Sequence, residues 1–355
     1  MADGQTVLLT NALHPDGQRM LDEAGVHSVL APDVAADTLR RLALEVDGII
    51  VRAQLPADIC EHAPRLKGIV RHGVGLDFIP VEAATAAGVP VANLPGCNTQ
   101  AVAEYVIAQL LNLRRPLLAV DAKLRSDGWD KARALPLGGG AKAASTSNVD
   151  DVLARAEGCW VRERMPAAGF SELGGTVLGI LGVGNVGARI ARIAQAIGMT
   201  VIGVCRDPSE VPPGVEAVSM DDLFARADAL VLSCALTPET RGIVNAERIA
   251  RMKPGAVVIN ASRGPVVDTA ALASALHEGR IAGAALDVYD QHPLEPGHPL
   301  FDCPNLLMTP HIAAITTTSM HAMSVGAVGE MLRILSGREP EHLVNPDYRK
   351  NRGQA

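Results

Sequence analysis

A guanidinium and an imidazole each stand after an apolar strand segment of this sequence. Arg263 follows the run Ala256–Ile259, and His311 follows the run Leu306–Met308. A charge at the end of a buried strand is either exposed or used, and a guanidinium can hold a carboxylate and polarise a nearby carbonyl oxygen. An imidazole titrates near neutrality, so it can give that oxygen a proton or take one back. The pair predicts acid–base chemistry on a small anionic compound.

A glycine-rich turn follows the expected strand Val177–Leu181 with the spacing G-x-G-x-x-G. Gly182 permits a tight turn, Gly184 lets the backbone approach a phosphate, and Gly187 lets helix and strand pack closely. The following helix, expected at Ala188–Ile197, offers unpaired N–H groups and its positive dipole end to phosphates. We therefore expect a dinucleotide here rather than a purely structural turn. Further cofactor contacts are expected from Asn185, Val186, Thr237, Pro238 and Ala261.

The residue that ends the next strand after this glycine turn and its helix decides between NAD and NADP. An acidic residue there accepts from the adenosine ribose and repels a 2′-phosphate, whereas a neutral residue followed by arginine does the reverse. Counting from Gly187 places Cys205 at this position, with Arg206 next. The sequence therefore favours NADP. NAD stays the alternative, because Asp207 could reach a ribose hydroxyl and Arg206 could be an ordinary turn residue.

Two series of alternating strands and helices must position these residues. The first occupies about the first hundred residues, and the second begins at Thr176. Such alternation predicts parallel sheets with helices on both faces. Six strands are expected in the second series: Val177–Leu181, Thr200–Val204, Ala229–Leu232, Ala256–Ile259, Gly283–Leu286 and Leu306–Met308. They fit a complete doubly wound dinucleotide fold, and one long helical stretch is expected at Thr99–Arg125.

The composition is typical of a compact soluble protein, with 48% hydrophobic and 20% charged residues. Aromatic residues make up only 3%, so the core must be aliphatic, which suits buried parallel strands. A net charge of −7 argues against nucleic acid and anionic membranes as partners. The first residues lack a secretory signal pattern, and the six cysteines lack metal-site spacing. We expect a cytoplasmic protein without a disulfide framework or a metal site.

Several motifs in order along the chain carry a family resemblance. They are Arg71–Asp77 (RHGVGLD), the run Asn98–Tyr105, Ile259–Asp268 (INASRGPVVD), Leu286–Tyr289 (LDVY) and Thr309–Ala313 (TPHIA). With them the sequence resembles the D-isomer-specific 2-hydroxyacid dehydrogenases, which include glyoxylate and hydroxypyruvate reductases, phosphoglycerate dehydrogenase and D-lactate dehydrogenase. The resemblance extends from about Val7 to Pro346.

The resemblance implies two doubly wound α/β domains with the active site in the cleft between them. A Rossmann NAD(P)-binding domain, residues 113–315, would be inserted in a flavodoxin-like substrate domain, residues 1–112 and 316–355. The segment 135–170 is longer than this region usually is in the family. We expect it to be an arm that reaches a second subunit of a homodimer, with a disordered loop as the alternative.

The resemblance also implies roles for individual residues. Arg263 would hold the substrate carboxylate and keto oxygen, and His311 would exchange the proton. Val74 and Gly75 would add backbone N–H donors to the carboxylate. Asp287 would receive the nicotinamide carboxamide or support the site.

One position departs from the family pattern. Five residues after Asp287 the family usually has a glutamate that orients the acid–base histidine and stabilises its imidazolium form. Here that residue is His292, which cannot do so by charge. Asp290 or Glu295 could substitute from nearby, and formate dehydrogenases of this superfamily have a neutral glutamine at the matching place. We expect His292 to have an active-site role.

These observations together predict an NADP(H)-preferring reductase of small 2-oxo acids, with glyoxylate or hydroxypyruvate as the expected class of substrate. One alternative is a dehydrogenase of another anionic hydroxyacid, such as phosphoglycerate or a sulfonated hydroxyacid. Another is a nucleotide-sensing binding protein akin to the corepressor branch of the superfamily. Arg263 and His311 argue against the corepressor, and His292 alone supports it.

Overall fold

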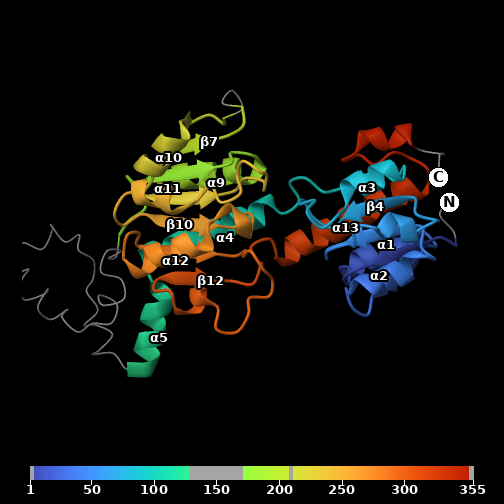
Figure 1. The fold of residues 1–355 in the computed structure, drawn as a ribbon, viewed down its shortest axis with the longest axis horizontal. Coiled ribbons are helices and arrows are strands. Elements are labelled where there is room, and N and C mark those ends of the chain that lie inside the picture. The colour runs from blue at the N-terminus through green and yellow to red at the C-terminus, as the bar shows by residue number, and fades with distance from the viewer. Residues whose placement is uncertain (1–3, 128–170, 208–210, 352–355) are drawn as a thin grey trace, which may run out of the picture. The chain divides into compact units, whose positions relative to one another are not determined.

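The chain folds into two compact α/β units, each with its own parallel sheet (Figure 1). The computed structural model describes residues 4–127, 171–207 and 211–351, so the predicted arm at 135–170 lies outside the described residues. Unit 1 comprises Met1–Asn98 and Ile315–Ala355, and unit 2 comprises Thr99–Ala314. The expected fold class of two parallel-sheet α/β domains is confirmed.

The observed division of the chain differs from the expected boundaries mainly at one helix. We expected the first boundary after residue 112, whereas unit 2 already begins at Thr99. The reason is that helix α4 (Thr99–Arg114) packs its apolar side chains, among them Val106 and Leu110, into the core of unit 2. The return to unit 1 falls at Ala314–Ile315, one residue from the expected place.

Unit 1 is built on a five-stranded parallel sheet in the order β2-β1-β3-β4-β5. Its strands are β1 (Thr6–Leu9), β2 (His27–Leu30), β3 (Gly48–Val51), β4 (Gly68–Arg71) and β5 (Val91–Ala92). This is the strand order of the flavodoxin-like doubly wound fold. The carboxyl ends of β1, β3 and β4 therefore meet at one edge of the sheet.

Helices cover both faces of this sheet. They are α1 (Pro15–Glu23), α2 (Ala36–Ala43), α3 (Val81–Ala86) and α13 (Thr317–Leu335), with 3₁₀ helices η1 (Ile59–His62) and η5 (Pro346–Lys350). Apolar residues of α1 and α13 form one core with the sheet, and those of α2, α3 and η1 form the other. Gly68 in β4 is required for this packing, because a Cβ there would lie 2.6 Å from a side-chain carbon of Ile334 on α13.

Unit 2 is built on a seven-stranded parallel sheet in the order β12-β11-β10-β9-β6-β7-β8. Its strands are β6 (Val177–Leu181), β7 (Thr200–Val204), β8 (Val215–Ala217), β9 (Ala229–Leu232), β10 (Val257–Asn260), β11 (Gly283–Leu286) and β12 (Leu306–Met308). All six expected strands are present within a residue of their predicted bounds. The seventh strand, β8, was not predicted, because it is a short edge strand that is mostly exposed and lacks an apolar run. The strand order reverses between β6 and β9, which is where open α/β sheets bind ligands.

Two layers of helices enclose the sheet of unit 2. Helix α4 packs with α9 (Asn185–Ala196) on one face, and α10 (Met220–Arg226), α11 (Ala246–Arg251) and α12 (Thr269–His277) pack on the other. Unit 2 also has two 3₁₀ helices, η3 (Gly264–Val266) and η4 (Pro299–Asp302). The helical stretch predicted at Thr99–Arg125 is observed as two helices, α4 and then α5 (Leu117–Asp127). Pro116 separates them, because proline has no N–H and its ring disfavours a helical residue before it.

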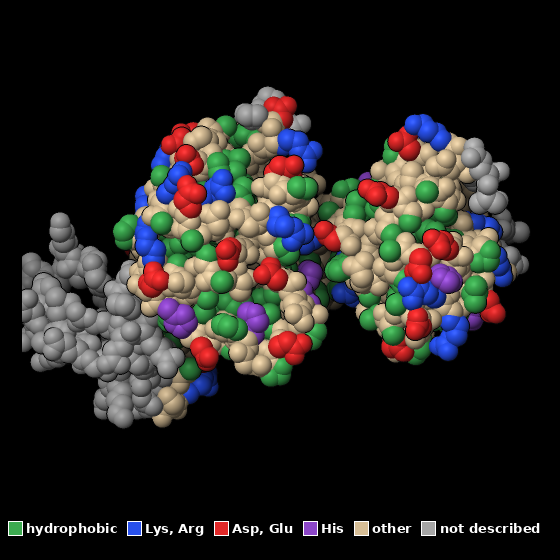
Figure 2. All heavy atoms as spheres, viewed as in Figure 1, with side chains coloured by type: hydrophobic (Ala, Val, Ile, Leu, Met, Phe, Trp, Pro, Cys, Tyr) green, Lys and Arg blue, Asp and Glu red, His purple; other side chains and the backbone are tan. Residues whose placement is uncertain are grey.

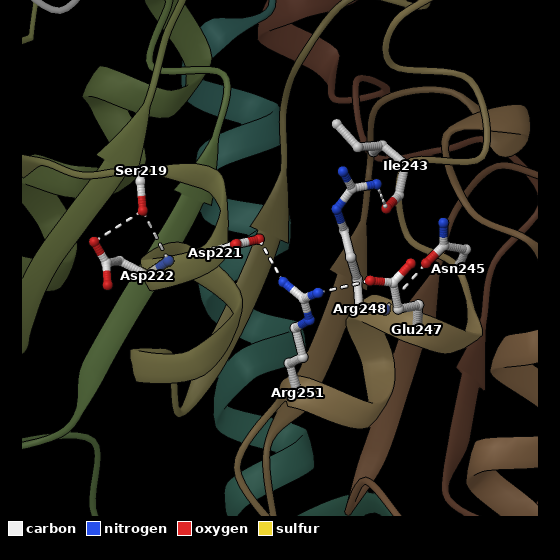
Figure 3. A network of polar contacts seen from close by, with 8 residues as sticks. All are labelled: Ser219, Asp221, Asp222, Ile243, Asn245, Glu247, Arg248 and Arg251. Atoms are coloured by element: carbon white, nitrogen blue, oxygen red, sulfur yellow. Dashed lines mark hydrogen bonds and ion pairs between the residues drawn. The ribbon is translucent and has the colours of Figure 1, made fainter.

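Surface ion pairs join neighbouring helices on the second face (Figure 3). Arg251 on α11 donates to Asp221 Oδ1 on α10 over 2.7 Å and to Glu247 Oε1 within its own helix over 2.6 Å. Such exposed pairs contribute only about 0.2–1 kcal/mol each. Acidic and basic side chains are interspersed in this way over the face of each unit seen in Figure 2. Among the described residues no helix combines the length and apolar character that crossing a membrane requires.

Candidate active site

The candidate residues of unit 2 follow neighbouring strands of one parallel sheet. Because parallel strands all end at the same edge, the loops after β6, β7, β9, β10, β11 and β12 emerge together there. The glycine turn follows β6 beside the point of strand reversal. Arg263, Asp287 and His311 follow β10, β11 and β12, which are adjacent strands toward one end of the sheet. A ligand that extends along this edge from β6 toward β12 would meet phosphate-binding backbone first and the guanidinium and imidazole afterwards.

The glycine turn has the features that a phosphate-binding loop requires. Gly182 has φ +94°, and a Cβ there would lie 2.6 Å from Cys234 Cα in the loop after β9. A Cβ at Gly187 would overlap the carbonyl oxygen of Gly182, so helix α9 can approach the turn only with glycine there. Gly184 is the N-cap of α9 but supplies no capping side chain, and the space beside its Cα is open. Asn185 and Val186 form the first turn of α9, whose N–H groups suit an anion.

The predicted specificity residues follow β7 as expected. Cys205 is half-buried and its Sγ donates to the Asp207 carbonyl over 2.9 Å, while Arg206 is exposed. In the loop after β9 the pKa of Glu239 is lowered first by a hydrogen bond from Thr237, then by its own backbone N–H, and also by the positive charge of Arg206.

A buried amide shapes the loop that carries Arg263. Asn260 is fully buried at the end of β10, and its Oδ1 accepts from Ser262 N over 3.0 Å and from Ser262 Oγ over 2.9 Å. Its Nδ2 donates to the Arg263 carbonyl over 2.9 Å, which fixes the backbone on both sides of half-buried Ala261. Arg263 Nη1 donates to the Ser262 carbonyl over 2.7 Å. Asn260 was part of a quoted motif, but its role as organiser of this loop was missed.

The loop after β11 is pressed against the loop after β10. A Cβ on Gly264 would overlap the carbonyl group of Tyr289, so only glycine at 264 allows this approach. Asp268, later in the same segment, caps helix α12 by accepting from Ala271 N over 3.0 Å. The close approach places the backbone of Arg263 next to the segment that leads to His292.

Asp287 holds the backbone on both sides of His311. The carboxylate is 1% exposed, and Oδ1 accepts from Thr309 Oγ1 over 2.6 Å and from Ile312 N over 2.8 Å. Oδ2 accepts from Ala313 N over 2.8 Å, and the Asp287 carbonyl accepts from His311 N over 2.9 Å. His311 itself has φ +57°, a conformation that is uncommon for a residue with a side chain. Of the two roles considered for Asp287, this geometry supports the positioning of the histidine loop.

Two tyrosine hydroxyls extend this network. Tyr105 OH lies 2.6 Å from Thr309 Oγ1, and Tyr289 OH lies 2.9 Å from the Thr309 carbonyl. Burial raises the pKa of Tyr289 to about 12 and also raises the pKa of Tyr105, so both remain protonated at neutral pH. They therefore fix Thr309 rather than exchange protons. Both tyrosines lie in the family motifs, but their sequence positions did not predict this role.

The structure brings His292 beside His311. The ring centroids are 5.5 Å apart, the planes are tilted by 40°, and both side chains are exposed. The Nε2 atom of His292 accepts from Tyr289 N over 3.2 Å, so its neutral ring carries the proton on Nδ1. Asp290, one suggested substitute for the family glutamate, accepts from Thr269 Oγ1 over 2.8 Å instead. The other suggested substitute, Glu295, accepts a hydrogen bond from Gln291 Nε2 at its Oε1 over 3.5 Å.

The predicted substrate loop of unit 1 follows β4, and hydrogen bonds to two of its carbonyl groups hold it in place. The Gly73 carbonyl accepts from Leu94 N over 2.9 Å, and the Val74 carbonyl accepts from Asn93 Nδ2 over 2.8 Å. In a trans peptide the N–H points opposite to the carbonyl. The N–H groups of Val74 and Gly75 therefore point away from these bonds, as donors to a ligand would have to.

His72, just before this loop, is buried and uncharged. It is 2% exposed, and its Nε2 lies 2.8 Å from Ser324 Oγ on α13. Burial, followed by the positive charge of Arg52, lowers the pKa of His72 to about 4. This ring packs under the loop and is unsuited to acid–base work near neutrality.

Comparisons with known proteins agree with the geometry. Residues 143–313 match the family model described as D-isomer specific 2-hydroxyacid dehydrogenase, NAD binding domain. A glyoxylate reductase of Aeropyrum pernix is 34% identical over 321 residues, which cover 89% of this chain and 88% of that protein. A D-3-phosphoglycerate dehydrogenase of Methanocaldococcus jannaschii is 33% identical over 345 residues, covering 96% of this chain but only 59% of that protein.

Solved structures extend the likeness to the whole fold. A protein from Thermus thermophilus superimposes with a TM-score of 0.79 at 32% identity, covering 96% of this chain and 100% of that one. An NADPH-dependent glyoxylate/hydroxypyruvate reductase from Sinorhizobium meliloti, solved with NADP and malonate, superimposes with a TM-score of 0.76. It is 29% identical, and the match covers 97% of this chain and 98% of that one. These matches confirm the family resemblance that the motifs suggested.

Proposed function

The chain belongs to the D-isomer specific 2-hydroxyacid dehydrogenase family, and from this premise we propose that it reduces a small 2-oxo acid with NADPH. At the coarser level it is an NAD(P)-dependent oxidoreductase of hydroxyacids. Glyoxylate and hydroxypyruvate are the proposed substrates, because relatives named for these reductions match most of the chain. One observation carries the proposal. Asp287 holds the backbone that follows His311, and the loops of Arg263 and His292 lie beside it at the same sheet edge.

The residues of unit 2 fit a dinucleotide. The open space at Gly184, the side-chain-free N-cap of α9 and the close approach at Gly187 all suit a pyrophosphate. When bound, a reduced nicotinamide supplies the hydride that reaches the keto carbon. Arg206 is exposed just after β7, and we propose that it pairs with the 2′-phosphate of NADPH.

The chain's own residues supply binding, polarisation and a proton. Arg263 is proposed to hold the substrate carboxylate and to stabilise the negative charge that develops on the 2-keto oxygen. His311 is proposed to donate its proton to that oxygen, while Asp287, through the backbone of residues 311–313, keeps the imidazole in place. The proposed role of Val74 and Gly75 as further carboxylate donors stays a prediction.

The second candidate substrate is a phosphorylated hydroxyacid. Its support is the 33% identity to D-3-phosphoglycerate dehydrogenases, of which this chain spans about three fifths. A homodimer and a cytoplasmic location remain proposals, which size-exclusion chromatography with light scattering and localisation of a tagged chain would test.

A turnover assay tests the proposed function. The chain is assayed against glyoxylate, hydroxypyruvate, pyruvate and 3-phosphohydroxypyruvate, each with NADPH and with NADH. We expect the highest kcat/KM for glyoxylate or hydroxypyruvate with NADPH. A preference for the phosphorylated acid would favour the second candidate, and a preference for NADH would show that Asp207 holds the ribose. Cofactor binding without turnover of any of these acids would contradict the proposal.

A further inference from the structure

Two imidazoles and a carboxylate meet on the surface of unit 1, outside the residues that the proposed reaction uses. His14 is the N-cap of α1, Asp16 lies in the first turn of α1, and His321 lies near the start of α13. Asp16 Oδ2 is 3.1 Å from His321 Nε2 and 3.5 Å from His14 Nδ1. One ligand atom from each residue lies within 4.8 Å of the other two. Sequence spacing could not reveal the cluster, because its members come from opposite ends of the chain.

The two separations between Asp16 Oδ2 and the histidine nitrogens match those of metal ligands. Zinc binds imidazole nitrogen and carboxylate oxygen at about 2.0–2.2 Å, so two ligands in a tetrahedral site lie about 3.3 Å apart. Two imidazoles with one carboxylate are a donor set that suits divalent zinc, copper, nickel or iron rather than calcium or magnesium. We propose that His14, Asp16 and His321 bind a divalent transition-metal ion, with water completing the coordination.

The surroundings orient the carboxylate for this role. Asp16 Oδ1 pairs with the guanidinium of Arg19, which leaves Oδ2 directed at the two rings. The rings of His14 and His321 cross edge to face with centroids 4.9 Å apart. The side chains of His14, Asp16 and His321 are 28%, 38% and 47% exposed, so an ion can enter from solvent. On binding, His14 Nδ1 would exchange its hydrogen bond from Asp16 N, now 3.2 Å, for the ion.

A bound ion would fasten α1 to α13. The two helices are already in close contact there, because a Cβ on Gly17 would lie 3.1 Å from Ser324 Cβ. Ser324 Oγ accepts from His14 N over 2.9 Å and lies 2.8 Å from His72 Nε2, so the same serine joins the cluster to the buried ring below it. The ion would therefore stabilise the folded state of unit 1, since a ligand that binds only the folded chain shifts the unfolding equilibrium.

The test uses the full chain after treatment with EDTA, with Zn²⁺ as the probe. Zinc uptake is measured by competition with a chromophoric chelator, and the thermal midpoint is followed by circular dichroism with and without Zn²⁺. We expect wild type to bind one equivalent of zinc. His321→Gln and Asp16→Asn should bind zinc at least about tenfold more weakly, which is the loss seen when a residue that supports a metal ligand is removed at known sites. The zinc-dependent rise in thermal midpoint should disappear in both variants.

The matched control is His62→Gln. His62 Nε2 lies 3.4 Å from Asp58 Oδ2, a pair with one imidazole and one carboxylate, and its loss should leave zinc uptake unchanged. The proposal is overturned if wild type shows no zinc-dependent stabilisation, or if His321→Gln and Asp16→Asn bind zinc as wild type does. The second result would place the ion elsewhere, for example at His292 and His311. If Asp16→Asn does not fold, His321→Gln decides alone, because its side chain is half-exposed and glutamine suits a helix.

Discussion

Each unit carries a histidine just beyond a strand of its parallel sheet, and the two rings have opposite environments. His72 in unit 1 is 2% exposed, lies against Ser324, and has a pKa lowered to about 4. His311 in unit 2 is exposed, with φ +57° and with backbone neighbours bound to a buried carboxylate. A histidine at the end of a strand therefore says little by itself. Burial against α13 makes the His72 ring a packing residue, whereas the His311 ring is exposed on a loop that Asp287 holds.

The largest effect expected from this contrast is on turnover. His311→Asn removes the imidazole but keeps a residue that tolerates a left-handed backbone, so the fold should be preserved. Because His311 is proposed as the general acid, its loss should lower kcat for the best 2-oxo acid by about 10²- to 10⁴-fold. His72→Gln should lower kcat far less and lower the thermal midpoint instead. Equal losses of kcat in the two variants would contradict the assignment of a packing role to His72 and a catalytic role to His311.

Arg263 allows a second contrast, with Arg251 in the same unit. Arg263→Ala should raise KM and lower kcat, because the guanidinium is proposed to act on both the bound acid and the developing oxyanion. Loss of one oxyanion donor typically costs about 10²- to 10³-fold in kcat. Arg251→Ala removes only the exposed ion pairs of α10 and α11 and should leave steady-state kinetics unchanged. Near-normal turnover by Arg263→Ala would refute the proposed role.

The pH dependence of stability sharpens the account of His72. Its pKa is lower in the folded chain, about 4, than the ordinary value of about 6.5 in the unfolded chain. The unfolded chain therefore binds the proton first, and the folded state loses stability as the pH falls from about 6.5 to about 4. The difference corresponds to about 3 kcal/mol. Urea unfolding at pH 7 and pH 4.5 should show a smaller loss in His72→Gln than in wild type. Equal losses would show that another group causes the acid sensitivity.

The smallest expected effect concerns His292. A carboxylate beside His311 would stabilise its imidazolium form, the form that is proposed to donate the proton during reduction. His292→Glu should therefore shift the alkaline limb of kcat/KM for reduction upward by about one pH unit, which is about 1.4 kcal/mol. Profiles are compared at constant ionic strength, with His292→Ala as the control for loss of the ring. An unmoved limb in both variants would exclude contact between residue 292 and the reacting imidazole.

The sequence predicted the elements better than the connections within the site. The strand and helix context identified the glycine turn: a Cβ would clash at Gly182 and at Gly187, and Gly184 leaves open space at the start of α9. The predicted helical stretch Thr99–Arg125 is divided into α4 and α5 at Pro116, where a break is expected for proline. The edge strand β8 gave no apolar signal.

The function of Asp287 could only be read from the fold. Its carboxylate accepts from groups more than twenty residues away in the chain, and sequence alone does not say where a backbone N–H points. Likewise, the motif around His72 did not reveal that its ring is buried. The burial comes from α13, at the other end of the chain.

The central claim is that unit 2 carries the chemistry of an NADPH-dependent 2-oxoacid reductase, and isotope transfer tests it most directly. Glyoxylate and hydroxypyruvate are reduced by wild-type chain with NADPH that carries deuterium at the reactive position of nicotinamide C4, and the products are analysed by mass spectrometry and NMR. The account predicts one deuterium at C2 of the product, D configuration of the glycerate formed from hydroxypyruvate, and loss of the reaction in His311→Asn. Product without deuterium at C2, or no consumption of NADPH with any 2-oxo acid, would contradict it.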